Sequence, residues 1–274
     1  AFIIFEKAEV DIAILEVGLG GRLDSVNVVD SDVSIITNIA IDHTDYLGDT
    51  REAIGREKAG VMRGSRPCIC GDQDPPQSLL AYAKEIGTDI TFVRKAYEDD
   101  IGLEGDHQRL NAAVAIQAVE SLKEQHPISF SMIIEGVKSA TIKARFEKIE
   151  IGEKTIILDV AHNPAAVKTL VDTLSKSSMQ TVAIFSALID KDIIEMVDLA
   201  SNAIKHWYLV PLTAERAIES DALKNKFSNP DSTTICKDMN SAIQESLAYK
   251  EAERIVIFGS FYTIADASII INEL

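Results

Sequence analysis

Three side chains near the start of the sequence have the chemistry of a metal site that binds phosphate. Glu16 closes an apolar run and precedes a glycine-rich turn, His43 follows Asp42, and Lys58 lies in a charged helical pattern. Carboxylate and imidazole groups ligate divalent cations, and Mg²⁺ commonly takes only one or two protein ligands. A lysine carbamylated by CO2 would add an anionic oxygen, which a lowered pKa favours. From spacing alone, a helix-capping acid, a surface histidine and a solvated lysine remain an open alternative.

A second group of polar residues follows a later apolar run. Asp159 ends that run, and the turn that follows contains His162 and Asn163 before a helix predicted to begin near Pro164. Such a turn presents polar side chains at the carboxyl edge of a parallel sheet. The alternative is that Asp159 or Asn163 only caps the helix.

Four further residues are weaker candidates. Asn111 lies in a helical pattern, and Arg145 has the guanidinium geometry suited to bidentate phosphate binding, although most single arginines are surface residues. Lys191 and Ser260 follow two other predicted strands and could hold a substrate carboxylate. Local evidence favours Ser260 as the cap of the last helix.

The elements that must position these residues alternate between apolar strands and amphipathic helices. We expect strands at 11–17, 33–37, 67–70 and 89–93, in a parallel sheet with its candidate residues at one edge. A second series of strands is expected at 155–159, 181–185, 207–210, 233–236 and 254–258. Helices between and after them are expected at about 165–176, 192–203, 219–227, 239–250 and 262–272. The second series indicates a Rossmann-like doubly wound domain.

A helical pair is predicted between the two series, at 106–123 and about 128–140. We therefore divide the chain into a first domain, 1–146, and a second domain, 147–274. The fold class is α/β.

Composition limits the function classes. The 274 residues include 43 acidic and 27 basic side chains, and the net charge of -16 argues against a nucleic-acid partner. Three cysteines cannot form a disulfide framework, which favours a reducing, cytoplasmic location. No apolar run is long enough to span a membrane. The sequence begins with Ala1 and not with Met, so we expect that the natural start lies upstream.

Taken together, the motifs resemble the folylpolyglutamate synthase and dihydrofolate synthase family, a branch of the Mur ligase superfamily. They are Leu15 to Asp24 (LEVGLGGRLD), Asp42 to Gly48 (DHTDYLG), Ile54 to Gly60 (IGREKAG), Asp159 to Pro164 (DVAHNP) and Gly259 to Phe261 (GSF). They occur in the family's order over nearly the whole chain. The resemblance implies a P-loop-type central ATP-binding domain followed by a C-terminal glutamate-ligase domain.

The implied reaction is an ATP-dependent amide ligation in folate biosynthesis. The carboxylate of a pteroate or folate becomes an acyl phosphate, the amine of L-glutamate attacks it, and phosphate leaves. By position, Glu16 and His43 resemble the family's Mg²⁺ ligands, and Lys58 its carbamylated lysine, N6-carboxylysine, which supports a second metal ion.

The resemblance also implies roles for the other candidates. Leu23, Asp24 and Ser25 fall on the turn that binds the pteroate. Asn111, Arg145 and Asp159 match nucleotide contacts, and His162 lies beside the reaction centre. Lys191 and Ser260 are similar to contacts with the incoming amino acid. Lys58, His162 and Asp159 are thus the candidate catalytic residues, and a monomer is expected.

Three departures from the family pattern qualify these expectations. The Gly-Thr-x-Gly-Lys-Gly-Ser loop is missing before Glu16, so we expect this chain by itself to be inactive. The sequence Lys143-Ala144-Arg145 replaces the usual Pro-Gly-Arg, and the stretch from Val93 to Gly105 is short. Two alternatives stay open: a Mur-type ligase of another carboxylic acid, and a non-catalytic binding module that lost its nucleotide loop. The choice between the dihydrofolate synthase and folylpolyglutamate synthase reactions also stays open.

Overall fold

The computed structural model describes residues 1–273, which form two compact units. Unit 1 comprises residues 1–99 and 109–136, and unit 2 comprises 100–108 and the chain from 137 onward. The chain therefore passes between the units three times, and neither unit is one continuous stretch of sequence. The single boundary at residue 146 stays a prediction.

Unit 1 is built on a three-stranded parallel sheet. Its strands are β1 (Ser34–Ile36), β2 (Cys68–Cys70) and β3 (Ile90–Phe92), with β2 in the centre. The helices up to residue 139 are α1 (Phe2–Lys7), α2 (Thr44–Leu47), α3 (Arg51–Ala59), α4 (Gln77–Ile86), α5 (Asp106–Ser121) and α6 (Phe130–Ser139). A short 3-10 helix, η1, spans Ser25–Val28.

The core of unit 1 lies on both faces of this sheet. Ile36 of β1 packs with Ile54 of α3 and Leu79 of α4. On the other face, Ile69 of β2 packs with Val114 of α5. This alternation follows from the period of two in a strand, which points successive side chains to opposite faces.

The strand expected at 11–17 is wrong. Residues 10–17 pair with no strand among the described residues, and Ile12 and Ile14 are 55% and 94% exposed. A β-strand is stabilised by hydrogen bonds to a neighbouring strand and by burial of its side chains, and this segment has neither in the described chain. Glu16 consequently does not stand at the end of a strand.

Unit 2 contains a six-stranded sheet in the order β4-β5-β9-β6-β7-β8. The strands are β4 (Glu147–Ile151), β5 (Lys154–Leu158), β6 (Thr181–Phe185), β7 (His206–Leu209), β8 (Thr233–Ile235) and β9 (Arg254–Phe258). All neighbours are parallel except β4 and β5, which are antiparallel. The sequence prediction omitted β4, whose alternation of charged and apolar residues is typical of an edge strand with one solvated face.

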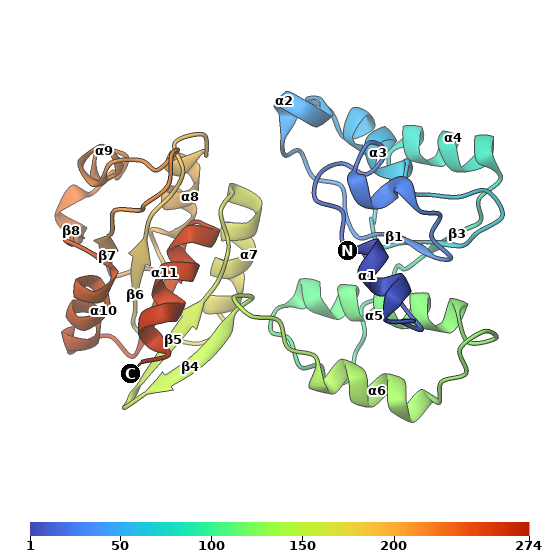
Figure 1. Ribbon diagram of the computed structural model, residues 1–274. Coiled ribbons are helices and arrows are strands. Elements are labelled where there is room, and N and C mark those ends of the chain that lie inside the picture. The colour runs from blue at the N-terminus through green and yellow to red at the C-terminus, as the bar shows by residue number, and fades with distance from the viewer. Residues whose placement is uncertain (274) are drawn as a thin grey trace. The chain divides into compact units, whose positions relative to one another are not determined.

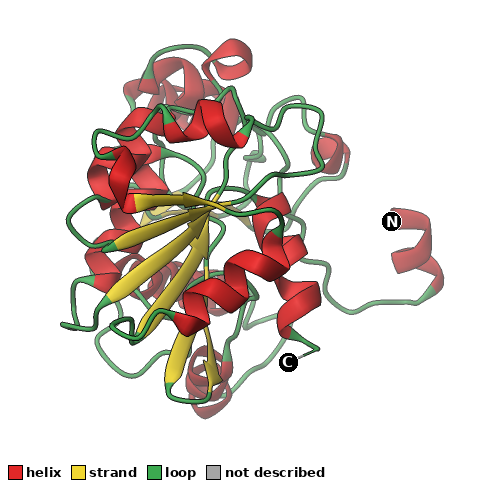
Figure 2. Cartoon of the chain, turned by 90° about the vertical axis from the view of Figure 1, so that its left-hand side faces the viewer, coloured by secondary structure: helices red, strands yellow, loops and turns green. Residues whose placement is uncertain are grey.

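Helices cover both faces of the unit 2 sheet (Figures 1 and 2), as a doubly wound domain requires. The helices are α7 (Pro164–Leu174), α8 (Ile193–Ala200), α9 (Ser220–Lys224), α10 (Met239–Ala248) and α11 (Phe261–Ile271), with the short 3-10 helix η2 (Pro230–Ser232). In β6, Phe185 packs into the core with α7 and α8, whereas Ile184 packs into the core with α10 and α11. The predicted α/β class and doubly wound second domain are confirmed.

The described helices are short. The longest, α5, has 16 residues, whereas about 20 apolar residues are needed to cross a bilayer. Within residues 1–273, no helix has the length and apolar character of a membrane span.

Candidate active site

The glycine-rich turn of unit 1 is organised by Asp24. Its Oδ2 accepts hydrogen bonds from the backbone amides of Gly18 and Leu19 at 2.9 and 3.0 Å, and its Oδ1 accepts from the amide of Val26 at 2.9 Å. These hydrogen bonds, led by that of Val26, lower the pKa of Asp24. Asp24 thus shapes the turn, and its neighbour Leu23 is left 78% exposed and available to a ligand.

This turn is fastened to the carboxyl end of α3. The amide of Arg22 donates to the carbonyl of Glu57 at 2.8 Å, and the Arg22 guanidinium pairs with the Glu57 carboxylate at 2.9 Å. Asn27 donates to the carbonyl of Gly60 at 2.9 Å. A Cβ on Gly60 would lie 2.4 Å from the Cβ of Arg22, so the close approach requires glycine. The turn with Leu23, Asp24 and Ser25 is thereby held beside the segment that contains Lys58.

Lys58 lies half-buried near the end of α3. Desolvation lowers the pKa of its ammonium group, and the charge of Asp42 opposes that shift. His43 is next to Asp42 in the chain: its amide donates to the Asp42 carboxylate at 2.8 Å, and its ring Nε2 lies 3.9 Å from the other carboxylate oxygen. The structure therefore groups Lys58 and His43 around one acidic side chain. Glu16, in contrast, is an exposed residue of the unpaired segment.

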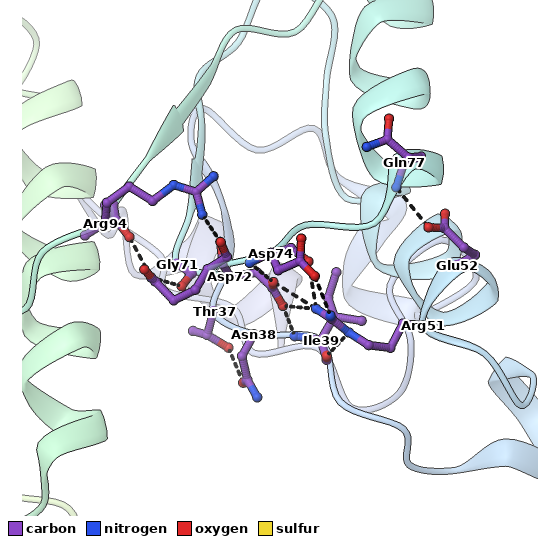
Figure 3. Close-up of polar contacts among 12 residues, drawn as sticks. Thr37, Asn38, Ile39, Arg51, Glu52, Gly71, Asp72, Asp74, Gln77 and Arg94 are labelled. Atoms are coloured by element: carbon purple, nitrogen blue, oxygen red, sulfur yellow. Dashed lines mark hydrogen bonds and ion pairs between the residues drawn. The ribbon is translucent and has the colours of Figure 1, made fainter.

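The sequence reasoning missed Asp72, which is 5% exposed and follows β2 (Figure 3). Its carboxylate accepts from the Ile39 amide at 2.6 Å and from the Arg51 guanidinium at 2.9 and 3.0 Å. Arg51 also donates to the carbonyl of Ile39 at 2.9 Å. This network fixes the loop that leads from β1 to His43. The available signal was an acidic residue two positions after a buried strand, similar to the signal that drew attention to Asp159.

Within residues 1–273 no group of three or more His, Cys, Asp and Glu side chains is arranged to hold a metal ion. The ligand set expected from the sequence is not such a group, because its third member is a modified lysine: the set is Glu16, His43 and carbamylated Lys58. The donor types fit a hard divalent cation that keeps most of its positions for water and phosphate oxygens. Desolvation of Lys58 also fits the chemistry of carbamylation, because only the neutral amine adds CO2.

In unit 2, Asp159 stands directly after β5 and is half-buried. Its Oδ2 accepts from the Phe146 amide at 2.9 Å, and its Oδ1 accepts from the Ala161 amide at 2.8 Å. Burial raises the pKa of Asp159, while those amides and the charge of Arg145 act in the opposite direction. Asp159 thus connects the segment that contains Arg145 to the carboxyl end of β5 in the unit 2 sheet.

The Arg145 segment has an unusual backbone. Ala144 and Phe146 both have positive φ, at 58° and 54°, and both are 8% exposed, whereas Arg145 between them is exposed. The amide of Val160 donates to the carbonyl of Ala144 at 2.9 Å. Left-handed conformations are unfavourable for residues with a Cβ, and here burial and hydrogen bonds maintain them. They turn the Arg145 side chain outward.

His162 and Asn163 differ in what their side chains do: Asn163 caps a helix, and His162 binds a backbone carbonyl. The Asn163 side chain accepts from the Ala166 amide at 2.9 Å and caps α7, as the structural alternative predicted. His162 Nδ1 lies 2.9 Å from the carbonyl oxygen of Val160, which can only accept. Nδ1 therefore carries a hydrogen, so Nε2 is the nitrogen that has the lone pair whenever the ring is neutral. The ring also lies 5.6 Å from that of Phe261.

Ser260 is the cap of α11. Its hydroxyl accepts from the Thr263 amide at 3.0 Å and lies 2.8 Å from the Thr263 hydroxyl, and the residue is 3% exposed. The capping interpretation is confirmed, whereas a substrate contact of Ser260 stays a prediction. Lys191 follows β6, with its ammonium 3.7 Å from the carboxylate of Asp190. Asn111 lies on α5 in unit 1 and is exposed.

Comparison with known proteins defines the class of this chain. Residues 2–95 match the Mur ligase middle domain, and residues 144–261 match the Mur ligase glutamate ligase domain. The chain is therefore a Mur-type ligase by fold and by domain content.

More specific matches come from whole proteins. The chain is 32% identical to dihydrofolate synthase/folylpolyglutamate synthase of Escherichia coli, over 98% of this chain and 67% of the relative. It is 35% identical to the protein of the same description in Buchnera aphidicola, over 97% of this chain and 68% of that one. Escherichia coli FolC, solved in complex with DHPP and ADP, superposes with a TM-score of 0.89 at 30% identity, over 98% of this chain and 68% of FolC. A synthase solved with Mn, AMPPNP and L-glutamate gives a TM-score of 0.86 at 35% identity, over 98% of this chain and 69% of the other. The chain belongs to the folylpolyglutamate synthase/dihydrofolate synthase family.

Proposed function

We propose that this chain works in an ATP-dependent ligase that joins L-glutamate to dihydropteroate or folate through an amide bond. The observation that carries the proposal is the match, over nearly the whole chain, to synthases solved with ADP, DHPP, AMPPNP and L-glutamate. The candidate residues support it, because both units present polar side chains of the types that such a reaction needs.

The proposed chemistry has two steps. The substrate carboxylate attacks the γ-phosphorus of ATP, which releases ADP and leaves an acyl phosphate. The amine of glutamate then attacks the acyl carbon, loses a proton, and expels phosphate as the amide forms. Charge builds on the phosphoryl oxygens in both steps, so cationic groups near them lower the barrier.

Arg145 and Asn111 are the proposed nucleotide contacts. The exposed guanidinium of Arg145 can bind phosphate oxygens in bidentate fashion. Asp159 contributes by fixing the backbone directly after Arg145, through the Phe146 amide, and by accepting hydrogen bonds from a ligand with its remaining lone pairs.

His162 is the proposed acceptor of the proton that the attacking amine loses. A neutral imidazole with its proton on Nδ1 has a lone pair on Nε2 for this purpose. Lys191 and Ser260 follow neighbouring strands of the same sheet, and we assign them to the carboxylates of the incoming glutamate. Leu23, Asp24 and Ser25 are assigned to the pteroate.

Glu16, His43 and Lys58 are the proposed holders of two Mg²⁺ ions, with Lys58 as N6-carboxylysine. When bound, the metal ions would neutralise charge on the transferred phosphoryl group. The lowered pKa of Lys58 supports its carbamylation, since it enlarges the fraction of neutral amine. Mass spectrometry of the native protein in bicarbonate tests this assignment: a reversible gain of one CO2 is expected, and it should be lost in K58R.

The function is tested with protein produced from the complete reading frame. ATP, L-glutamate and either dihydropteroate or a folate are supplied, and ADP and the glutamylated product are measured by chromatography and mass spectrometry. Formation of both products, dependent on the acceptor acid, is expected. A substrate panel of other carboxylic acids gives the contrary outcome. If ATP were turned over only with one of those acids, and not with dihydropteroate or a folate, the folate assignment would be contradicted and a different Mur-type ligase favoured.

Matched variants locate the reaction on the proposed residues. K58R and D159N should each lower kcat by about a hundredfold or more, the range for removing a group that acts on the transition state. K84R and D172N change exposed residues of the same types in the same units and should retain activity. Equal loss in the variants and their controls would contradict the assigned site. We further propose that the enzyme is cytoplasmic and a monomer, and sedimentation of the same preparation tests the monomeric state.

A further inference from the structure

A cavity of about 660 Å³ lies in unit 2, away from every residue assigned to the ligase reaction. Most of its lining comes from within the segments that lead into strands: 174–181 before and at the start of β6, 201–207 before and within β7, and 227–232 before β8. Val197 and Asp198 of α8 also line it. Arg254, the first residue of β9, completes the lining. Because β6, β7, β8 and β9 are parallel, this is the amino edge of the sheet.

The candidate ligase residues of unit 2 lie at the opposite edge. Asp159, Lys191 and Ser260 all follow the carboxyl ends of their strands. A ligand in this cavity would therefore leave the proposed ligase residues uncovered. Its volume lies within the range of about 300–1,000 Å³ that small-molecule sites occupy.

Arg254 gives the cavity its chemical character. The residue is 5% exposed, and its guanidinium donates to the Thr181 hydroxyl at 2.8 Å, the Ser177 hydroxyl at 2.9 Å and the Leu174 carbonyl at 3.0 Å. These three contacts use three of its five N–H donors. Among the described residues no carboxylate lies within ion-pair distance of it, although Glu253 acts on it at longer range. A buried cation is costly unless an anion or hydrogen bonds compensate its charge.

Part of that compensation comes from the carboxyl end of α7, where the Leu174 carbonyl lies, because the helix dipole is negative there. Two N–H donors of the guanidinium remain for a ligand. Lys205 adds a second positive charge to the lining, against one negative charge from Asp198, whose carboxylate accepts from the Ser228 hydroxyl at 3.3 Å. The lining side chains thus carry two positive charges and one negative charge, and the Glu253 carboxylate lies beside them, where it accepts from the Gln180 amide at 3.0 Å. Serine hydroxyls of 175, 177 and 178 supply further donors.

We propose that this cavity binds a small molecule through a phosphate or carboxylate group, with Arg254 as the principal contact and Lys205 at the rim. Guanidinium and hydroxyl donors together recognise either oxyanion. The proposal is independent of the ligase function, since it uses none of the residues assigned to that reaction.

The test is an NMR titration of the purified chain with inorganic phosphate and, separately, with acetate, at constant ionic strength set by sodium chloride. Saturable shifts are expected for the Arg254 Nε–H and for the backbone amides of residues 177–181. The oxyanion that gives the tighter dissociation constant identifies the group. Shifts confined to the surroundings of His162 and Lys191, or no saturable shift with either probe, would overturn the proposal.

Variants separate a ligand contact from general electrostatics. R254K keeps the charge but loses the planar set of donors, and it should weaken binding about tenfold or more. K205A should weaken binding up to about fivefold, the range for an exposed ion pair. K237A removes an equally exposed lysine outside the cavity and should bind as the unmodified chain does. K205A and K237A alter only exposed side chains, so both variants should fold even if R254K does not. Equal affinities of these two variants for the oxyanion would show that Lys205 is not a ligand contact.

Discussion

In unit 2 Asp159 and Ser260 stand within two residues of the ends of buried strands, whereas in unit 1 Asp24 and His43 stand on loops that polar side chains hold in place. Asp159 and Ser260 follow β5 and β9, which lie next to each other between two apolar cores. In unit 1, Asp24 and His43 depend on the turn fastened to Glu57 and on the Asp72 network. Strand ends thus position residues through burial, and loops position them through a few hydrogen bonds and ion pairs. The two units should therefore respond to different substitutions.

The largest effect is expected from G259A in unit 2. Gly259 has a φ of +114°, and a Cβ there would lie 2.0 Å from the carbonyl oxygen of Ser186. Strain and overpacking together should lower the free energy of unfolding by about 4 kcal/mol. Denaturant unfolding monitored by Trp207, the single tryptophan, measures the loss. G136A, where a Cβ meets no atom within 4 Å, is the control, and an equal loss in both variants would contradict this account.

The next largest effect is expected from D72A in unit 1. The substitution leaves the Ile39 amide and the Arg51 guanidinium without their buried acceptor, at a cost of about 3 kcal/mol. Hydrogen exchange of the β1 and β2 amides should accelerate, while the unfolding transition of Trp207 stays unchanged. D74A is the control, because Asp74 is 95% exposed and pairs with Arg51 only at 3.6 Å. A shift of the Trp207 transition in D72A would show that the units do not respond separately.

A smaller effect is expected from S260A, which removes the cap of α11. Loss of the hydrogen bond to the Thr263 amide should lower the free energy of unfolding by about 1 kcal/mol. S260T retains a hydroxyl and should recover most of that stability. The KM for L-glutamate distinguishes the second role: a raised KM in S260A, out of proportion to the loss of stability, supports the proposed substrate contact, and an unchanged KM leaves Ser260 as a cap only.

The smallest effect is expected from the pH dependence of K58M. The folded-state pKa of Lys58 is lowered from 10.5, so between the folded pKa and 10.5 the unfolded chain binds more protons and stability rises with pH. K58M should remove this rise and be slightly more stable than the unmodified chain at neutral pH without bicarbonate, by less than about 1 kcal/mol. Urea unfolding at several pH values measures it. K84M, which changes an exposed lysine, is the control. If K84M and K58M gave the same dependence of stability on pH, the desolvation of Lys58 would be contradicted.

Most of unit 2 could be predicted from the sequence. The run from Arg254 to Phe258 and the pattern Asp159 to Pro164 predicted a strand and a strand-turn-helix that the structure confirms. Local rules gave the right answer there, because the run is short, rich in β-branched residues and flanked by turn residues, which favours a buried strand over a helix. The charged edge strand β4 was missed because its apolar content is low.

In unit 1 the same rules failed at residues 11–17 and did not find Asp72. An apolar run predicts a strand only where a neighbouring strand pairs with it, and that pairing is a property of the fold, not of the run. Similarly, nothing near Asp72 in the sequence reveals that Arg51 and the Ile39 amide meet its carboxylate.

The sequence by itself determined the types of side chain available for chemistry, the family and the doubly wound second domain. Tertiary structure decided which of these side chains are buried, paired or exposed. It made Asp24, Asn163 and Ser260 hydrogen-bond acceptors for backbone amides, desolvated Lys58, and left Arg254 at the wall of a cavity. The physical reason is that residue type and spacing follow from the chain, whereas desolvation and hydrogen-bond partners arise from residues that are distant in sequence and meet only in the folded protein.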